Sequence, residues 1–177
     1  MTASPRRTLA APAVRHLVAL AVLAASCGPS SQPAPTAGKP LDACAIFTAA
    51  DAQAVLGEPE VVEMSSFLNE AKGTKDPSQC GYNAGSDPSI VLRLELRQSA
   101  SPDQARSAHE SARSLLATSG VRDVAGLGDG AFWVGGGIGQ LHVLHGSVRL
   151  LITSQVGEGK DAVATAKAVA ARVLSRM

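Results

Sequence analysis

The alternation in residues 89–98, SIVLRLELRQ, constrains the fold of this chain more than any other feature of its sequence. Large apolar side chains occupy every second position from Ile90 to Leu96, and the positions between them include Arg93, Glu95 and Arg97. Because successive side chains of a β-strand point to opposite faces, this segment predicts a strand with one face on the core and one toward solvent. A second layer must therefore cover the apolar face.

Helical segments that could form this layer carry start and stop signals. Ser101 is placed to cap a helix that begins at Pro102, and Gly120 is expected to end it. A shorter helix is expected over residues 48–57, and a last one from about Lys160 to near the end of the chain. The inward stripe predicted for the middle helix is Ala105, Ala108, Ala112 and Leu115.

Two hairpins complete the predicted secondary structure. One spans residues 79–98, and the other spans residues 139–155 with a two-residue turn at Gly146 and Ser147. Because a helix follows each hairpin, the chain contains two hairpin-plus-helix units. We therefore expect an α+β fold in which helices pack on one face of an antiparallel sheet. The opposite, polar face is expected to meet water, with contact to a partner as the alternative.

The N-terminus has the pattern of a secretory signal peptide over residues 1–26. Arg6, Arg7 and Arg15 precede an apolar core of nine residues, Leu17 to Ala25. That core is too short to span a bilayer, which needs about 20 residues. A buried N-terminal helix is the less favoured alternative, because Pro-rich sequence follows directly.

The apolar core ends in Leu23-Ala24-Ala25-Ser26-Cys27, which resembles the lipobox of bacterial lipoproteins. The resemblance implies cleavage before Cys27 and lipidation of its thiol, with fatty acyl chains such as palmitate. Ala24 stands where leucine is commonest in the pattern. The alternative is ordinary cleavage that leaves Cys27 free to form a disulfide. Residues 27–40 then form the lipidated cysteine and a disordered Pro-rich linker, and residues 41–177 form a single globular domain.

Charge excludes one class of partner. The whole chain has 16 Lys and Arg against 15 Asp and Glu, and removal of residues 1–26 leaves 13 basic and 15 acidic side chains. Such a chain lacks the positive charge that nucleic-acid binding requires. The expected partners are the membrane, through the lipid, and an unidentified envelope protein, glycan or small ligand. The expected location is extracytoplasmic, on the cell membrane or outer membrane.

Cys44 and Cys80 remain once Cys27 carries lipid, and an even pair in an exported protein is expected to form a disulfide. Metal ligation is a weaker alternative, because neither cysteine belongs to a CxxC motif. No cofactor or metal is expected. The glycine-rich segments GLGDG and GGGIG precede no helix and are interpreted as turns. His109, His142 and His145 are interpreted as surface residues, with His142 and His145 on opposite faces of a strand.

Trp133 is the chain's only tryptophan, and its adjacent position to Phe132 in a predicted strand places the two on opposite faces of the sheet. A place at the edge of the core is the preferred interpretation of Trp133. The alternative is an exposed aromatic that binds a glycan or protein, together with Arg93 and Arg97 on the polar strand face. The leading hypothesis is a non-enzymatic binding module. A carrier of a small apolar ligand and an envelope hydrolase are the other two.

Three segments resemble a family of small bacterial lipoproteins of unknown function that is abundant in actinobacteria. They are DACAIFT at residues 42–48, CGY at residues 80–82 and GLGD at residues 126–129 before a hairpin. The resemblance covers most of residues 42–153. It implies an extracytoplasmic lipoprotein with a disulfide between Cys44 and Cys80, and it brings no catalytic residues.

Overall fold

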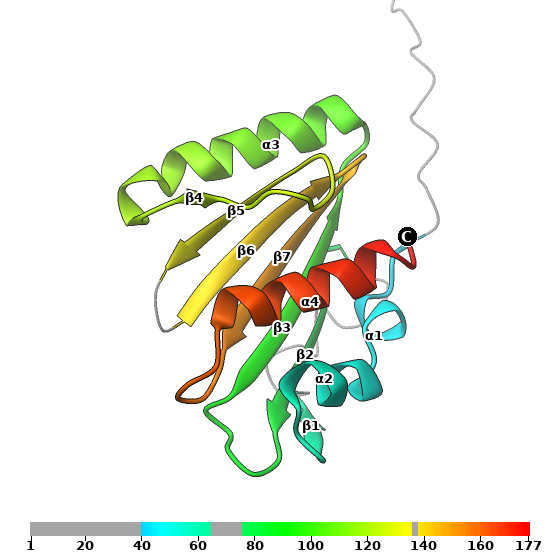
Figure 1. Ribbon diagram of the computed structural model, residues 1–177. Coiled ribbons are helices and arrows are strands. Elements are labelled where there is room, and N and C mark those ends of the chain that lie inside the picture. Colours follow the sequence, from blue (N-terminus) through cyan, green and yellow to red (C-terminus); the bar gives the residue numbers. More distant parts are fainter. Residues whose placement is uncertain (1–39, 65–75, 136–137) are drawn as a thin grey trace, which may run out of the picture. The chain divides into compact units, whose positions relative to one another are not determined.

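The computed structural model describes residues 40–64, 76–135 and 138–177 (Figure 1). Its described part forms one antiparallel sheet with the strand order β1-β2-β3-β7-β6-β5-β4. The strands are β1 (Val61–Glu63), β2 (Ser78–Ala84), β3 (Val91–Gln98), β4 (Arg122–Asp123), β5 (Gly130–Gly135), β6 (Ile138–His145) and β7 (Val148–Gln155). The α-helices are α1 (Ala43–Ile46), α2 (Ala49–Leu56), α3 (Pro102–Leu115) and α4 (Ala162–Leu174). The predicted antiparallel α+β fold is confirmed.

The two predicted hairpin-plus-helix units are also present. The hairpin of β2 and β3 precedes α3, and the hairpin of β6 and β7 precedes α4. The second hairpin turns at Gly146 and Ser147, where Gly146 has the positive φ of 55° that a tight turn requires. The units meet where β3 pairs with β7, so that Leu94 lies opposite Ile152 in the middle of the sheet.

One face of the sheet carries the main core and is called the α4 face here. The apolar positions of β3 lie on it, beside β6 and β7, which are covered by α4. The inward residues of α4 are small and fully buried. These α4 residues are Ala166, Val169, Ala170 and Val173. The sheet residues beneath are Leu92, Leu94, Leu96, Trp133, Leu141, Val143, Leu150 and Ile152.

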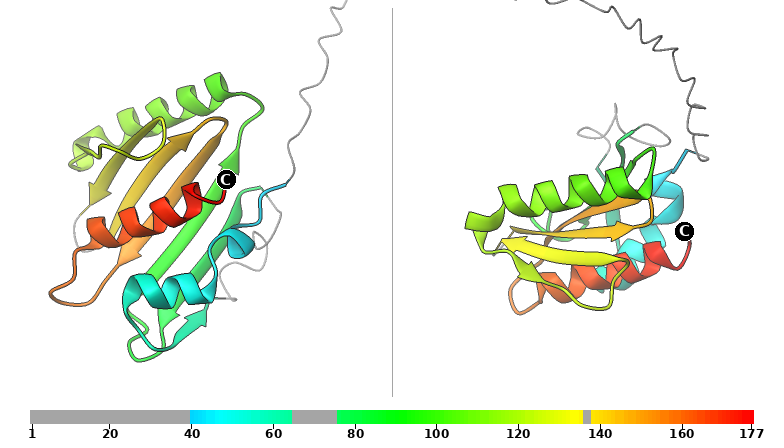
Figure 2. Two further views of the ribbon diagram at one scale, coloured as in Figure 1. Left: turned by 45° about the vertical axis from the view of Figure 1, so that its right-hand side comes forward. Right: turned by 90° about the horizontal axis from the view of Figure 1, so that it is seen from above.

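The helices pack on both faces of the sheet, and not on one face as the sequence predicted. Figure 2, seen from above, shows α3 on one side of the sheet and α4 on the other. The physical reason lies in β5 and β6, whose Phe132 and Leu144 are buried and point away from the α4 face. This second apolar patch needs a cover, and α3 supplies it. The second face is called the α3 face below.

The packing stripe of α3 also differs from the prediction. Ala105 and His109 are buried, whereas Leu115 is 83% exposed. A helix turns by about 100° per residue, so Leu116 falls in line with Ala105, His109 and Ala112, and Leu115 lies to the side. The α-helix ends at Leu115 and a 3₁₀ turn, Ala117–Ser119, continues to Gly120.

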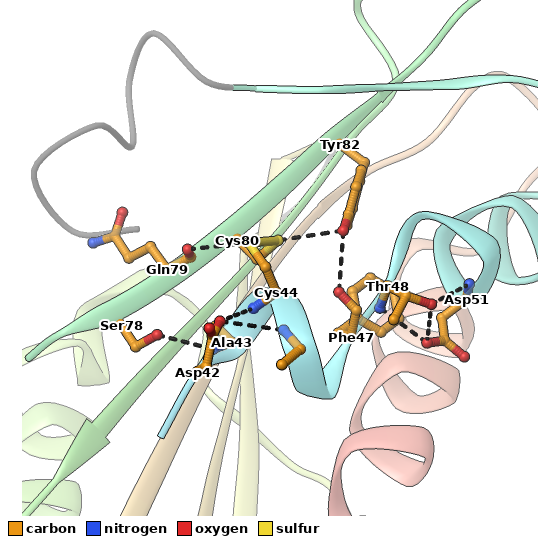
Figure 3. The surroundings of a disulfide bond; sticks show 11 residues. Asp42, Ala43, Cys44, Phe47, Thr48, Asp51, Ser78, Gln79, Cys80 and Tyr82 are labelled. Atoms are coloured by element: carbon orange, nitrogen blue, oxygen red, sulfur yellow. Dashed lines mark hydrogen bonds between the residues drawn. A yellow bond between two sulfur atoms is a disulfide. The ribbon is translucent and has the colours of Figure 1, made fainter. Parts of the chain in front are cut away.

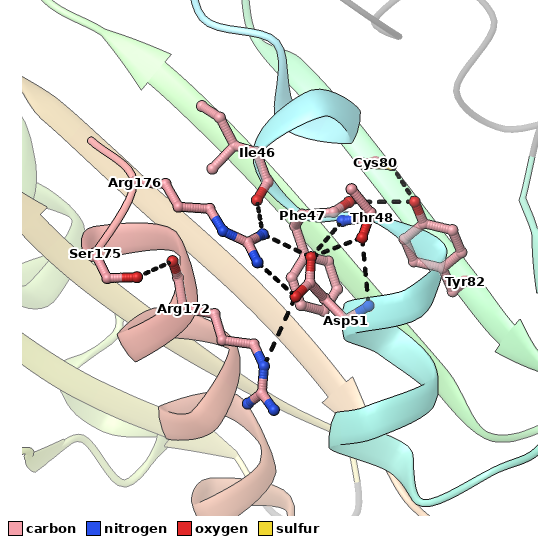
Figure 4. Close-up of polar contacts among 9 residues, drawn as sticks. All are labelled: Ile46, Phe47, Thr48, Asp51, Cys80, Tyr82, Arg172, Ser175 and Arg176. Atoms are coloured by element: carbon pink, nitrogen blue, oxygen red, sulfur yellow. Dashed lines mark hydrogen bonds and ion pairs between the residues drawn. The ribbon is translucent and has the colours of Figure 1, made fainter.

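The N-terminal helices attach to the rest of the fold through polar contacts of α2. Thr48 and Asp51 form the expected capping box, and Gly57 ends α2 in a left-handed conformation. The carboxylate of Asp51 also accepts hydrogen bonds from Arg176, with distances of 2.6 Å from Nη1 and 2.8 Å from Nη2 (Figure 4). Arg176 follows α4, so this pair fastens the C-terminal helix to α2. Its guanidinium holds the pKa of Asp51 well below the usual range of a carboxyl group.

The segments predicted to be the signal peptide, the lipidated Cys27 and the linker to residue 39 lie outside the described residues. Within the part that the structure describes, none of the helices combines the length and the apolar character needed to cross a bilayer.

Candidate binding site

The two cysteines of the domain form the disulfide that the sequence predicted. Cys44 of α1 and Cys80 of β2 are bonded, with Cα atoms 5.0 Å apart (Figure 3). The backbone N–H of Ala43 donates to Ser78 Oγ at 2.9 Å, and the buried Tyr82 hydroxyl donates to the carbonyl of Phe47 at 3.2 Å. These contacts fix the N-terminal helices on β2. Because both thiols are consumed, this cluster is structural and is no site for a cysteine nucleophile.

The α3 face holds a different cluster, in which Phe132 lies between two histidines. Phe132 of β5 and His142 of β6 are directly opposite in the sheet, and their rings stack with centroids 4.5 Å apart and planes 11° apart. His109 of α3 packs on Phe132 from above, with a centroid distance of 4.9 Å. The guanidinium of Arg113 lies 5.8 Å from the centre of the same ring. This stack fixes α3 on the sheet.

A pocket of about 190 Å³ lies beside this stack, between α3 and the sheet. We call it the α3 pocket. Its walls come from α3, β3, β6 and β7. The lining residues are Glu95, Arg97, His109, Ala112, His142, Arg149, Leu150 and Leu151. Five of these eight residues have ionisable side chains. The α3 pocket therefore differs from the core on the α4 face, which is apolar.

The single carboxylate of the pocket, Glu95, is already paired. Glu95 is 8% exposed and accepts a hydrogen bond from Gln79 Nε2 at 2.8 Å. Its other oxygen accepts a hydrogen bond from Nε of Arg97, which forms an ion pair with it. Arg97 thus compensates the charge of Glu95 and is itself half-exposed at the rim.

Arg149, by contrast, has no carboxylate within ion-pair distance among the described residues. Its Nη1 donates to the carbonyl of Ala108 in α3 at 3.4 Å, and its Nε is buried without a hydrogen-bond partner in the part of the chain that the structure describes. Burial and then the neighbouring Arg97 lower the pKa of Arg149, although the carboxylates of Glu95 and Asp76 partly oppose this effect. A cation in this environment is destabilised unless an anion joins it.

The environment of the two pocket histidines lowers the pKa of both and so favours their neutral forms at pH 7. Burial lowers the pKa of His142 to about 4, and His109 and Arg149 add to the effect. Burial also lowers the pKa of His109, followed by repulsion from Arg149 and Arg113. His142 Nε2 is buried and has no hydrogen-bond partner among the described residues. A neutral imidazole offers one N–H donor and one acceptor, so both rings can bind a polar ligand without adding charge.

The predicted binding residues Trp133, Arg93 and Arg97 do not form one site in the structure. Trp133 is 1% exposed in the core of the α4 face, where its Nε1 donates to the carbonyl of Gly135 at 3.0 Å. The preferred interpretation of Trp133 as a core residue holds, and its alternative as an exposed anchor is wrong. Arg97 lines the α3 pocket. Arg93 points to the same face of β3 but does not line it.

Sequence reasoning missed His109, His142 and Arg149. It treated His109 and His142 as surface residues, whereas His109 is buried and His142 is half-buried. His145 is exposed, and the strand register places it on the face opposite His142, as predicted. The available signal was the alternation of β5, β6 and β7, which places Phe132, His142 and Arg149 on one face.

Across residues 40–64, 76–135 and 138–177, His, Cys, Asp and Glu side chains form no group of three or more that could hold a metal ion. Neither the family models nor the characterised proteins to which the chain was compared give a match.

Proposed function

We propose that this chain is an extracytoplasmic lipoprotein that acts as a non-enzymatic binding module. A lipid on Cys27 anchors it to the cell membrane or outer membrane, and residues 28–40 hold the domain away from the lipid surface. Support comes from the basic head, the short apolar core and the sequence LAASC at residues 23–27. The disulfide between Cys44 and Cys80 agrees with export, because such bonds persist in oxidising compartments. Membership in the resembled lipoprotein family is part of this proposal.

The observation that carries the binding role is the α3 pocket, where Arg149 is half-buried without a carboxylate partner among the described residues. A pocket with a few convergent polar groups is the usual form of a small-ligand site. The ligand is a small molecule or a terminal group of an envelope protein or glycan, and not a nucleic acid. Binding is favoured over hydrolysis because Phe132 packs against both histidines, and no hydrogen bond among the described residues joins either histidine to a serine or cysteine.

A carrier of a small apolar ligand is the alternative function. The α3 pocket does not favour it, because charged side chains line the space between helix and sheet. On the α4 face, Ala166, Ala170 and Val173 are fully buried, which is typical of close packing of helix on sheet.

Mass spectrometry of the N-terminus of the membrane-purified protein tests the anchor. We expect a mature chain that begins at Cys27 and carries a diacylglycerol thioether, and a Cys27→Ala variant that stays unprocessed. A mature chain with a free thiol at Cys27 would contradict the proposal.

Site-specific crosslinking tests the binding role. A photoreactive amino acid replaces Ala112, which lines the α3 pocket, and in a matched variant it replaces the exposed Leu115 on the same helix. In intact cells we expect a defined adduct from position 112 that position 115 does not give. Equal labelling at both positions, or none at either, would count against the pocket as the binding site.

A further inference from the structure

We propose that the α3 pocket binds a small oxyanion, the carboxylate or phosphate group of a small ligand, with Arg149 as its main contact. This inference rests on the proposed binding function and adds the chemical class of the ligand.

The lining of the pocket carries more positive than negative charge, which favours the binding of an anion. Two guanidinium groups, of Arg97 and Arg149, line the pocket with one carboxylate, and that carboxylate is already paired with Arg97 and bonded to Gln79. A second carboxylate, Asp76, acts on Arg149 from outside the lining and forms no ion pair with it. Among the described residues, Arg149 has a single long hydrogen bond, to the carbonyl of Ala108 at 3.4 Å. An anion in the pocket would supply the missing charge, and the low dielectric of a half-buried site would strengthen the attraction.

The hydrogen-bonding groups of the pocket also match an oxyanion. The planar guanidinium of arginine presents a fork of N–H groups that pairs with two oxygens of a carboxylate or phosphate. His142 and His109 stand beside Arg149 as neutral rings, and each can donate one N–H to an anionic oxygen. Phe132 holds both rings in place from the side, so the donors are fixed before a ligand arrives.

Other ligand classes fit less well. A cation would meet two arginines and only one carboxylate, which is already engaged. An apolar ligand would bury Arg149 further without compensating its charge. The volume of about 190 Å³ admits a small molecule or the terminal group of a larger one. The remaining choice is therefore whether the oxyanion of the ligand is a phosphate group or a carboxylate group.

Titration of the full chain in non-ionic detergent with three probes tests the inference. The probes are sodium phosphate, sodium sulfate and sodium succinate, at an ionic strength held constant with sodium chloride. Isothermal titration calorimetry gives the affinity, and the rise in Tm gives a second readout. We expect at least one probe to bind, with succinate alone indicating a carboxylate ligand and phosphate or sulfate alone indicating a phosphate-like ligand.

Matched variants test whether the anion binds at Arg149 and not elsewhere on the protein. Arg149→Gln is expected to weaken binding at least tenfold, whereas Arg93→Gln, on the same face of the sheet but outside the pocket, should change it less than twofold. Arg149→Lys keeps the charge without the fork and should lie between Arg149→Gln and the unmodified chain. The fold of Arg149→Gln is checked by its Tm without anion, which should equal or exceed that of the unmodified chain because an uncompensated cation has been removed.

Three outcomes would overturn the inference. They are the absence of binding by all three probes, an equal loss in Arg149→Gln and Arg93→Gln, and binding that persists in Arg149→Gln. Failure of the anchor at Cys27 would leave these titrations unchanged. A crosslinked partner at position 112 without anion binding would refute the oxyanion alone and leave the binding module standing.

Discussion

His142 stacks on Phe132 on the α3 face, and its pKa of about 4 lies below the value near 6.5 of an unfolded histidine. The folded state therefore binds this proton more weakly than the unfolded state. The stability that the neutral ring contributes is complete above about pH 6.5 and is lost as the pH falls toward 4. The titratable and charged groups that line the pocket with it are Glu95 and Arg97 of β3, Arg149 of β7 and His109 of α3. Arg113 of α3 and Asp123 of β4 lie against the neighbouring Phe132.

This linkage gives a prediction for acid stability. Between pH 6.5 and 4.5 the full shift would lower the free energy of unfolding by about 2 kcal/mol, and after reduction for the partial exposure of the ring we expect a fall of roughly 1 kcal/mol. His142→Gln should remove a large part of this fall, and His145→Gln, an exposed residue of the same strand, should not. Urea denaturation across this pH range measures the effect. Identical slopes for the two variants would contradict it. Asp51 does not interfere, because its contribution is lost only at lower pH, near the unfolded carboxyl pKa.

The indole ring of Trp133 packs so closely on Gly139 that no side chain fits at this position. A Cβ added at Gly139 would lie 1.7 Å from Cζ2 of Trp133, whereas a Cβ added at Gly130 would meet nothing within 4 Å. Gly139→Ala must therefore displace a fully buried indole and should lower the free energy of unfolding by about 3 kcal/mol. Gly130→Ala, in the neighbouring strand, should change it by less than about 1 kcal/mol. Circular dichroism during denaturation measures both. Equal losses would show that the indole moves aside freely.

At the scale of elements, the disulfide joins α1 to β2 across a loop of 36 residues. The chain-entropy model assigns such a crosslink roughly 4 kcal/mol, mainly by restricting the unfolded chain. The double variant Cys44→Ala/Cys80→Ala should lose about that much stability, and Cys27→Ala should lose none. Chemical denaturation of the three proteins measures the difference. A double variant as stable as the parent would contradict the prediction.

For the whole molecule, the layering predicts a gradient of local stability. The central strand β7 pairs with β3 and β6 and contacts both α3 and α4. The strands β1 and β4 have three and two residues and are the outermost strands of the sheet as far as the structure describes it. Amide hydrogen exchange should therefore be slowest in β7, close to global unfolding, and fastest in β1 and β4. Exchange in β4 as slow as in β7 would contradict this gradient.

Local patterns were enough to predict much of the fold. The alternation of residues 90–97, the cap at Thr48 and the turn at Gly146 depend on neighbours in the chain, and all three appear as expected. The sequence by itself also predicted the disulfide between Cys44 and Cys80, which the structure contains. It did not show α1, because a helix of four residues has too few positions to display a period.

Only the tertiary structure decided which face of the sheet each helix covers. The charged side of β3 suggested a solvated face, but that face also includes Phe132, Leu144 and His142 from strands distant along the chain. Their side chains become one surface only after β3 pairs with β7, and this surface then buries part of α3. The α3 pocket has the same origin, because three strands and a helix arrange its lining so that Arg149 has no carboxylate within ion-pair distance among the residues described. Burial and the absence of a partner are properties of that assembled surface, and no local pattern in the sequence encodes them.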